Sequence, residues 1–326
     1  ENKDIQAVLV VTPLNEHERM AIDSLSSGKH VFCEKSVALT LEGCKHVYDA
    51  YKRYGKVLFI GQQRLFDPKY IRAMEMIHSG LIGTITGMRA YWYRNNDWRR
   101  ETPSPDLERR INWRLYRDSS AGLVTELAAH QLQVGDWALG MRPESVTGYG
   151  DIVYWKDGRE VYDNISLIYR YPNGIKMSYE SVISNKFLGL EELILGDKGT
   201  MELEKGKYYF EEAQPAPGIL QLINQIEHKI FDNVTFAGPS WVPETASINK
   251  GYYVTDKVNT TSGASSVGAA GDGSVELLTA FCNSSITGLT NDSLVEEAYY
   301  SSVFALLGLQ AMEEHRIVSF PKELEI

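Results

Sequence analysis

The feature that most constrains the fold is a regular alternation of short apolar runs with amphipathic segments at the start of the chain. Three apolar runs lie at residues 7–11, 30–33 and 57–60, and two segments with helical spacing separate them. The second of these segments begins at Thr40, a capping residue, and ends at Gly55. Strands that are apolar on both faces are typical of a parallel sheet covered by helices. The order strand, helix, strand, helix, strand with short links predicts a doubly wound parallel α/β domain over residues 1–64.

The rest of the chain follows a different pattern. Runs such as "TITGMRAYWYR" and "NISLIYRYPNGIKMSYESVI" alternate apolar and polar residues, which predicts strands with one exposed face. The segments "YPNG" and "GDKG" are hairpin turn signals. Helical spacing returns at residues 119–140 and 293–316, and residues 259–273 read as a Gly/Ser-rich mobile loop. We expect residues 65–326 to form an α+β domain with a large open antiparallel or mixed sheet, and the last helix to return to the first domain.

Composition limits the partners of this protein. The net charge is −10, whereas nucleic-acid binding requires an excess of Lys and Arg. The sequence has no apolar run of about 18 or more residues, the length that spans a membrane. Three cysteines at scattered positions supply neither a disulfide framework nor a zinc site. We therefore expect a small-molecule ligand, with no nucleic acid, membrane or metal partner.

Polar residues follow each of the three predicted strands. Thr12-Pro13 follow the first strand, Glu34-Lys35 follow the second, and Arg64 lies just beyond the third. In a doubly wound sheet, ligands bind at the carboxyl ends of the strands, so these residues would face one crevice. From position alone, a solvated strand end is an equally good interpretation of Glu34 and Lys35.

The predicted helix at residues 119–140 carries a second candidate group. Glu126 and His130 are four residues apart and so share a helix face. A helix-face hydrogen bond is the simpler interpretation of this pair taken alone. A metal pair is less favoured because no third histidine or cysteine is suitably placed.

Two further pairs are weak signals by themselves. Asn15 and His17 lie just beyond the first predicted strand, where they could also serve only to cap a helix. Trp113 and Arg114 are adjacent, and an ordinary packing or cation–π pair explains them equally well. The combination of all these residues is more specific than any one of them.

The motifs occur in a defined order. The stretch "VTPLNEHERMAIDSLSSGKHVFCEKSVALT" contains T-P-x-x-x-H and G-K-H-V-x-x-E-K, and "NWRLYRDSSAGLVTELAAHQLQVGDW" follows much later. Through "EEAYYSSVFALLGLQAMEEHRIVSFP" near the carboxyl end, the chain resembles the Gfo/Idh/MocA family, the relatives of glucose–fructose oxidoreductase and inositol dehydrogenase. The resemblance implies a Rossmann domain that binds NAD or NADP, of which residues 1–64 would be the C-terminal half. It also implies a second domain that binds a sugar, sugar derivative or cyclitol and oxidises or reduces a hydroxyl, and a homodimer or homotetramer.

The resemblance assigns roles to the candidate residues. Lys35 would be the lysine of the family's E-K-P motif, close to the reacting hydroxyl and the nicotinamide, and His130 would be the acid/base histidine. The cofactor side would be formed by Thr12, Pro13, Asn15, His17, Glu34, Lys35, Arg64, Trp113 and Arg114, and the substrate side by Lys35, Glu126 and His130. A histidine with a pKa of about 6.5 suits proton transfer at neutral pH, and a nearby ammonium group stabilises the developing alkoxide.

Three features depart from the family pattern. Ser36 stands where the E-K-P motif has proline, which loosens the turn after Lys35, and Glu126 stands where the family often has aspartate. The G-x-G-x-x-G motif, whose turn and helix bind the pyrophosphate, is absent. We interpret the chain as a fragment or processed form that lacks roughly 60 preceding residues, and without them we expect poor or no NAD binding. We expect a cytoplasmic protein, or a periplasmic one if a signal peptide came first.

Two other functions stay open at this point. An NAD-dependent glycosidase resembling N-acetylgalactosaminidases would oxidise its sugar transiently, release the aglycone and restore the hydride. A non-catalytic sugar-binding module would need neither Lys35 nor His130. Bound NAD and aglycone release without net redox change would identify the glycosidase. Absence of nucleotide and unchanged sugar affinity in Lys35→Ala would favour the binding module.

Overall fold

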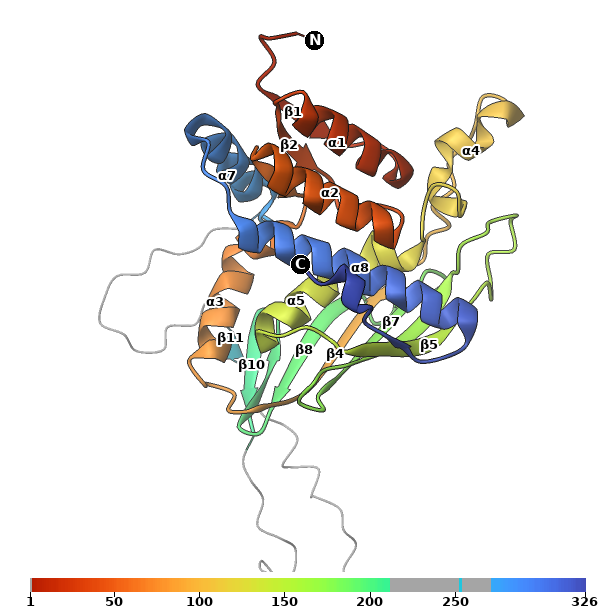
Figure 1. Ribbon diagram of the computed structural model, residues 1–326. Coiled ribbons are helices and arrows are strands. Elements are labelled where there is room, and N and C mark those ends of the chain that lie inside the picture. The colour runs from red at the N-terminus through yellow and green to blue at the C-terminus, as the bar shows by residue number, and fades with distance from the viewer. Residues whose placement is uncertain (1, 212–251, 254–270) are drawn as a thin grey trace, which may run out of the picture.

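The computed structural model describes residues 2–211, 252–253 and 271–326, and the chain forms two sheets (Figure 1). The first is a three-stranded parallel sheet in the order β1-β2-β3. Its strands are β1 (Ala7–Val10), β2 (His30–Cys33) and β3 (Leu58–Ile60). The predicted parallel α/β arrangement is confirmed, and each strand begins and ends within about one residue of the expected position.

Two helices cover one face of this sheet. They are α1 (His17–Ser26) and α2 (Leu41–Tyr54). The Oγ1 atom of Thr40 accepts a 2.9 Å hydrogen bond from the Gly43 amide and so caps the start of α2. Gly55, with a left-handed φ of 59°, ends the helix as the sequence predicts.

A helix from the far end of the chain covers the other face. In α7 (Ser274–Thr287), the ring of Phe281 packs edge-on against Phe32 and Phe59, with ring centroids 5.7 and 5.8 Å apart. These rings belong to a small apolar cluster that is separate from the main core. The helix that covers this face of the first sheet therefore follows every strand of the second sheet in the chain except β12 (Val318–Ser319).

Strand β1 lies at the edge of the first sheet. Among the described strands it pairs only with β2. Leu9 is 55% exposed and Val11 is 65% exposed. The edge of the first sheet at β1 thus exposes apolar side chains.

The second sheet has nine strands in the order β11-β10-β9-β8-β4-β7-β6-β5-β12. It is mixed because β4 and β7 run parallel, whereas the other neighbours are antiparallel. The strands are β4 (Ile85–Tyr93), β5 (Ser145–Asp151), β6 (Asn164–Arg170), β7 (Lys176–Val182), β8 (Leu190–Gly196), β9 (Gly199–Glu202), β10 (Lys207–Phe210), β11 (Tyr252–Tyr253) and β12 (Val318–Ser319). Both predicted hairpin turns join neighbouring strands, β6 to β7 and β8 to β9.

Helices cover one face of the second sheet, and its other face is open (Figure 1). The covering helices are α3 (Pro68–His78), α5 (Ala129–Leu139) and α8 (Asp292–Glu314). Shorter elements in the connections are η1 (Leu14–Glu16), η2 (Gln63–Phe66), η3 (Pro105–Leu107), α4 (Glu108–Ile111), η4 (Trp113–Leu115), η5 (Val124–Ala128) and η7 (Lys322–Leu324).

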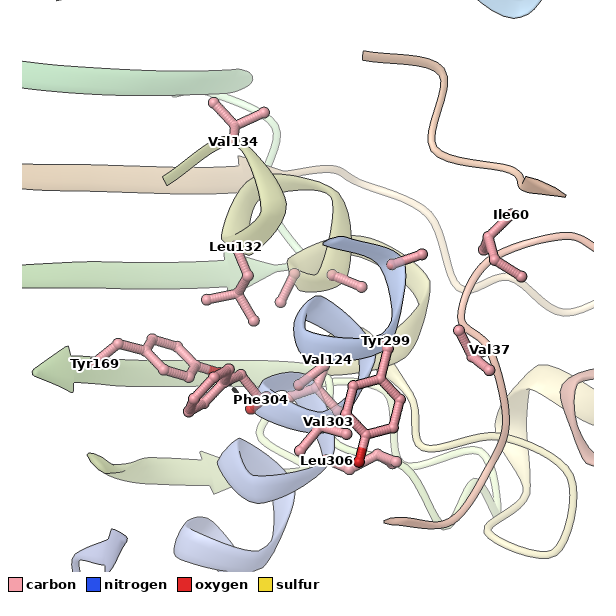
Figure 2. Packing of buried hydrophobic residues seen from close by; sticks show 14 of the residues in the cluster. Val37, Ile60, Val124, Leu132, Val134, Tyr169, Tyr299, Val303, Phe304 and Leu306 are labelled. Carbon is pink, nitrogen blue, oxygen red and sulfur yellow. Dashed lines mark hydrogen bonds between the residues drawn. The ribbon is translucent and has the colours of Figure 1, made fainter. Parts of the chain in front are cut away.

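Helix α8 joins the two sheets into one core. Figure 2 shows its residues Tyr299 and Phe304 between Val37 of the first domain and Tyr169 of the second sheet. A Cβ atom at Gly308 of α8 would lie 2.5 Å from the Tyr169 hydroxyl, so the helix can approach the sheet this closely only at a glycine. The site described below lies where the two domains meet. The sequence patterns of the separate domains do not show this contact.

Two observations concern partners that the sequence argued against, and a third concerns a predicted loop. Within the described residues, no helix combines the length and apolar character needed to cross a membrane. The same part of the chain contains no group of three or more His, Cys, Asp or Glu placed to hold a metal ion. Most of the predicted loop at 259–273 lies outside the described residues.

Candidate active site

A cavity of about 300 Å³ lies at the carboxyl ends of the parallel strands, where the first domain faces α5. Its lining consists of Glu34, Lys35, Gly61, Gln63, His130 and Ser274 on the polar side and of Leu9, Val11, Phe32, Leu277 and Leu278 on the apolar side. Three residues predicted from the sequence, Glu34, Lys35 and His130, thus surround one cavity. Doubly wound sheets bind their ligands at this end.

The ammonium group of Lys35 is held by the main chain of the second domain. Its Nζ atom donates to the carbonyl oxygen of Glu126 at 2.7 Å and to that of Thr125 at 3.3 Å. Both carbonyls belong to η5, a single turn of π-helix within the segment predicted as an ordinary helix. Such turns are rare and occur often at functional sites. Burial lowers the pKa of Lys35, and the carboxylates of Glu126 and Glu34 oppose that shift.

The turn after Lys35 is fixed by hydrogen bonds. The Lys35–Ser36 peptide bond is cis, and Ser36 Oγ donates to the Thr125 carbonyl oxygen at 3.2 Å. The carbonyl oxygen of Ser36 lies 2.8 Å from His17 Nδ1, and the carbonyl oxygen of Thr12 lies 3.1 Å from His17 Nε2. The expected loosening of this turn by serine is not observed, because the Ser36 hydroxyl and the His17 ring hold the turn.

His130 lies on α5 against an aromatic ring. Its side chain is buried, and its ring centroid is 6.0 Å from that of Trp92. Burial lowers the pKa of His130 well below its usual range, and the positive charges of Lys35, Arg64 and Arg94 lower it further. A neutral imidazole at neutral pH can accept a proton from a ligand in the cavity.

Glu126 contacts Lys35 and Arg114 by different groups. Its main-chain carbonyl binds Lys35, and its carboxylate accepts a 2.9 Å hydrogen bond from Arg114 Nε. The Arg114 guanidinium in turn lies 4.3 Å from the centre of the Trp113 ring. No side-chain hydrogen bond among the described residues joins Glu126 to His130, so their spacing of four does not pair the two side chains.

Arg64 lies behind the cavity wall. Its buried guanidinium pairs with Glu192, whose carboxylate also accepts a 2.7 Å hydrogen bond from the Tyr70 hydroxyl. The same guanidinium lies 5.4 Å from the centre of the Trp92 ring. Gln63, its neighbour in η2, lines the cavity instead. In this structure Arg64 acts on the site through its charge and through Trp92.

The other residues predicted for the cofactor side lie around the end of β1. Thr12 and Pro13 are partly buried and Asn15 is exposed. The Oγ1 atom of Thr12 is buried and has no hydrogen-bond partner among the described residues. His17 is buried beneath them, and both of its ring nitrogens face main-chain oxygens. It therefore supports the turns of the site and does not line the cavity.

Comparison with known protein families agrees with this arrangement. Residues 1–62 match the family model described as oxidoreductase family, NAD-binding Rossmann fold. Residues 70–202 match the GFO/IDH/MocA C-terminal domain. The chain belongs to the GFO/IDH/MocA oxidoreductase family.

Characterised and uncharacterised relatives are similar to parts of the chain. An uncharacterised oxidoreductase of Streptococcus pneumoniae serotype 4 is 28% identical over 213 residues, which are 62% of this chain and 53% of that protein. The scyllo-inositol 2-dehydrogenase (NAD(+)) of Bacillus subtilis is 30% identical over 153 residues, which are 47% of this chain and 41% of that protein. The chain spans about half the length of the curated relatives it matches.

Solved structures share the fold. An oxidoreductase domain protein from Kribbella flavida superposes with a TM-score of 0.73 at 18% identity, covering 98% of this chain and 82% of that one. A levoglucosan dehydrogenase in complex with NADH and levoglucosan superposes with a TM-score of 0.70 at 19% identity, with the same coverage of 98% and 82%. The predicted fold class, a partial Rossmann domain followed by a domain with a large mixed sheet, is confirmed.

The family implies a nicotinamide dinucleotide, and the described residues fit its nicotinamide end. The buried hydroxyl of Thr12 lacks a partner, and a buried polar atom is normally satisfied by a protein group or a ligand. A Cβ atom at Gly61 would lie 2.6 Å from Glu34 Oε2, so this carboxylate can occupy the strand end only beside a glycine. Thr12, Glu34 and Lys35 would hold the ribose and nicotinamide there.

Sequence patterns did not identify two parts of the site. Trp92 lies behind His130, and the alternation of buried residues along β4 could have placed it on the inner face. The α7 residues Ser274, Leu277 and Leu278 line the cavity, although they follow β3 by more than 200 positions. No local sequence signal predicts that α7 lines the cavity, because only packing brings α7 to the first sheet.

Proposed function

We propose that the protein is an NAD(P)-dependent oxidoreductase that transfers a hydride to or from a secondary hydroxyl of a sugar, sugar derivative or cyclitol. The observation that supports this best is that Lys35 and His130 line the same cavity at the strand ends. One group is a fixed cation and the other is a histidine whose pKa is lowered. Together they supply the polar chemistry that oxidation of an alcohol requires.

His130 acts as the general base in the direction of oxidation. Its lowered pKa keeps the imidazole neutral at pH 7, so that it can take the proton of the substrate hydroxyl. In the direction of reduction the same nitrogen returns that proton to the forming alcohol. The Trp92 ring packs beside the imidazole, with 6.0 Å between the two ring centroids.

Lys35 stabilises the negative charge that develops on the substrate oxygen. Two of its three N–H donors are directed at the carbonyl oxygens of Thr125 and Glu126, which leaves one for the substrate. Because the π-helical turn fixes the ammonium, the group needs little reorganisation when charge develops. Arg114 and Glu126 neutralise each other beside it.

The nicotinamide supplies the hydride chemistry when it is bound. Thr12, Glu34 and Lys35 would hold its ribose, with Pro13 and Asn15 beside them, and Trp113 and Arg114 would lie near its nicotinamide. The choice between NAD and NADP depends on groups at the adenosine ribose.

The activities for which several relatives are named support a cyclic polyol as substrate. They include inositol 2-dehydrogenase of Burkholderia cenocepacia and scyllo-inositol 2-dehydrogenase of Bacillus subtilis. The names also include a dehydrogenase of a carboxy-chloro-dihydroxycyclohexadiene from Comamonas testosteroni and a 2,7-anhydro-N-acetylneuraminate hydratase from Mediterraneibacter gnavus. The substrates of these relatives therefore include neutral and acidic rings.

We propose in addition that the open face of the second sheet packs against another copy in a homodimer or homotetramer. Apolar groups on this face support the proposal, since Ile168 is 47% exposed and the rings of Tyr91 and Tyr93 pack side by side, 6.1 Å apart. Residues of this kind on an exposed sheet are typical of an interface.

The test is direct. The full-length natural protein is purified, its nucleotide is released by denaturation and identified, and reduction of NAD+ and NADP+ is followed with a panel of hexoses, glycosides and inositols. Bound nucleotide and sugar-dependent reduction support the proposal. Aglycone release without net reduction would assign the glycosidase mechanism, and absence of both nucleotide and turnover would overturn the proposal.

A further inference from the structure

An arginine at the end of β4 lies beside the site and has no anionic partner. Arg94 follows Trp92 by two positions, which places both side chains on the same face of the sheet. The Arg94 guanidinium carbon lies 4.8 Å from the centre of the Trp92 ring, and the His130 ring packs against the same indole. The guanidinium is therefore one aromatic ring away from the proposed base.

The other arginines of the site are neutralised within the protein. Arg64 pairs with Glu192, and Arg114 pairs with Glu126. Among the residues that the structure describes, no carboxylate forms an ion pair or hydrogen bond with the Arg94 side chain, and burial lowers its pKa. In a protein with a net charge of −10, an arginine without a carboxylate beside the active site is an unbalanced local charge.

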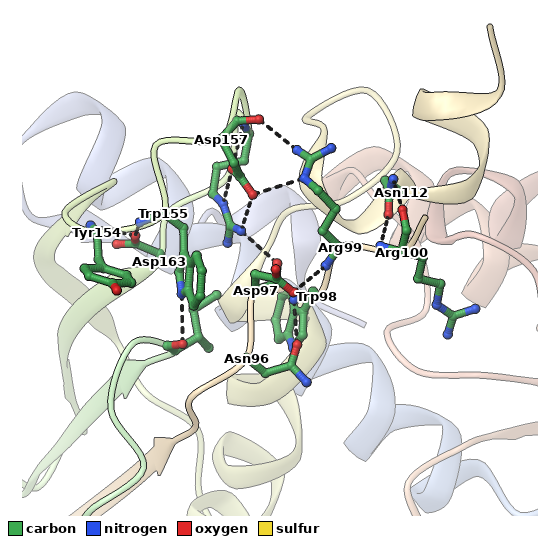
Figure 3. A network of polar contacts seen from close by, with 12 residues as sticks. Asn96, Asp97, Trp98, Arg99, Arg100, Asn112, Tyr154, Trp155, Asp157 and Asp163 are labelled. Carbon is green, nitrogen blue, oxygen red and sulfur yellow. Dashed lines mark hydrogen bonds and ion pairs between the residues drawn. The ribbon is translucent and has the colours of Figure 1, made fainter. Parts of the chain in front are cut away.

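The segment that follows Arg94, residues 96–100, is held by a network of polar contacts (Figure 3). The Asp157 carboxylate accepts hydrogen bonds from Arg99 Nε at 3.2 Å and from Arg159 Nε at 2.8 Å. Arg159 Nη2 donates in turn to the carbonyl oxygen of Asp97 at 2.7 Å. The guanidinium of Arg159 is fully buried, so this connection is shielded from water.

The same segment is tied to the residues that precede Trp113. The Asn112 side chain accepts from the Arg100 amide at 2.7 Å and donates to the Arg100 carbonyl oxygen at 3.0 Å. Trp98 has a left-handed φ of 60°, which is strained for an aromatic residue, and its amide donates to Asn96 Oδ1 at 2.6 Å. Strain of this kind persists only where the surroundings impose it. The segment is therefore preorganised, as a binding site requires.

We propose that Arg94 binds a carboxylate of the substrate, so that the enzyme acts on an acidic sugar such as a uronic acid or a uronoside. A guanidinium presents two parallel N–H groups that match a carboxylate. The Arg94 residue is exposed, and its guanidinium lies against the Trp92 ring that also contacts His130. This assignment rests on the proposed function, because it identifies the substrate of the same site. The rigid segment sets the distance between the carboxylate and the reacting hydroxyl.

The experiment compares a matched pair of substrates on the full-length natural protein. Methyl glucuronoside and methyl glucoside differ only in the carboxylate, and kcat/KM with the preferred cofactor is measured for each. We expect the acidic sugar to be preferred. In Arg94→Gln that preference falls roughly tenfold to a hundredfold, as for the loss of one charge-assisted hydrogen-bond pair. Arg94→Lys should retain part of the preference for the acidic sugar, because lysine keeps the positive charge but lacks the two parallel N–H donors of the guanidinium.

The matched control is Arg100→Gln, which removes the same charge from an exposed side chain of the same segment. We expect it to leave the preference as in the natural protein. An equal loss for both sugars in Arg94→Gln, or no preference in the natural protein, would overturn the assignment.

If neither sugar is oxidised, binding of methyl glucuronoside is measured by calorimetry in the presence of NAD+. Binding that Arg94→Gln weakens at least tenfold supports the carboxylate site while the proposed oxidoreductase function fails. Binding that is absent, or that Arg94→Gln does not change, overturns the carboxylate site as well.

Discussion

Lys35 Nζ donates a hydrogen bond to the main-chain carbonyl oxygen of Glu126, 2.7 Å away, and so connects the end of the central parallel strand to the π-helical turn before α5. The two residues are 91 positions apart. The location of the ammonium group thus depends on both domains. Any displacement of α5 relative to the first sheet would move the ammonium group from its position beside the cavity.

Replacing Lys35 with Met should remove most of the activity while leaving the fold intact. The lost ammonium stabilises the alkoxide, and loss of one such group typically lowers kcat by about 10²–10³-fold. Turnover of the full-length protein and its far-ultraviolet circular dichroism are measured together. Replacement of the exposed Lys3, which lies outside the site, is the control. Activity within about threefold of the natural protein would exclude this role for Lys35.

The pH dependence of oxidation should reflect the lowered pKa of His130. Because burial and neighbouring cations keep the imidazole neutral, kcat/KM should stay level from pH 8 to below about 6.5, the usual histidine pKa. It should fall only at more acid pH, where the base becomes protonated. The profile is recorded between pH 5 and 8 at constant ionic strength. A midpoint at or above the usual value would contradict the assignment, and His130→Asn should lose roughly 10²–10⁴-fold in rate.

Breaking the buried pair of Arg64 and Glu192 should destabilise the protein. Arg64→Met or Glu192→Gln leaves one buried group without its partner, which costs about 3–5 kcal/mol in the free energy of unfolding. The double variant should lose less than the sum of the two single variants, since no unpaired charge is left. Urea unfolding followed by tryptophan fluorescence measures all three. Strictly additive losses would show that the two side chains do not interact.

Asp136 should make stability fall as the pH rises. Burial raises the pKa of Asp136 to about 8, and its carboxyl oxygen accepts a 2.9 Å hydrogen bond from the Tyr171 hydroxyl. Between about pH 4 and 8 the folded protein holds a proton that the unfolded chain has lost, so the free energy of unfolding decreases over this range.

The variant that tests this is Asp136→Asn, which keeps the shape and stays neutral. We compare the free energies of unfolding of the variant and the natural protein at each pH. From pH 5 to pH 8 this difference should shift in favour of the variant by at least about 1.4 kcal/mol, the value of one pKa unit. Unfolding is measured at pH 5, 6.5 and 8 for both proteins. The same slope in both would mean that Asp136 is ionised in the folded state.

Local sequence determined the elements of the first domain. The apolar runs at 30–33 and 57–60 predicted β2 and β3, and Thr40 and Gly55 predicted the ends of α2. These predictions succeed because strand and helix patterns, caps and turns depend on neighbours within a few residues. The same reasoning placed Glu34 and Lys35 at a strand end, where the topology of a parallel sheet directs ligands.

Only the tertiary structure decided how the candidate side chains are used. Arg64 was expected at a ligand and instead pairs with Glu192, 128 positions away, and His17 binds the turn at Ser36. The carbonyls that hold Lys35, the indole that supports His130 and the α7 wall of the cavity also come from distant segments. Periodicity reports which face of an element is buried, but a hydrogen bond needs a partner within about 3 Å. That partner is chosen by the packing of α8 and α5 between the two sheets, because close packing leaves each buried polar group only the neighbours that the fold brings to it.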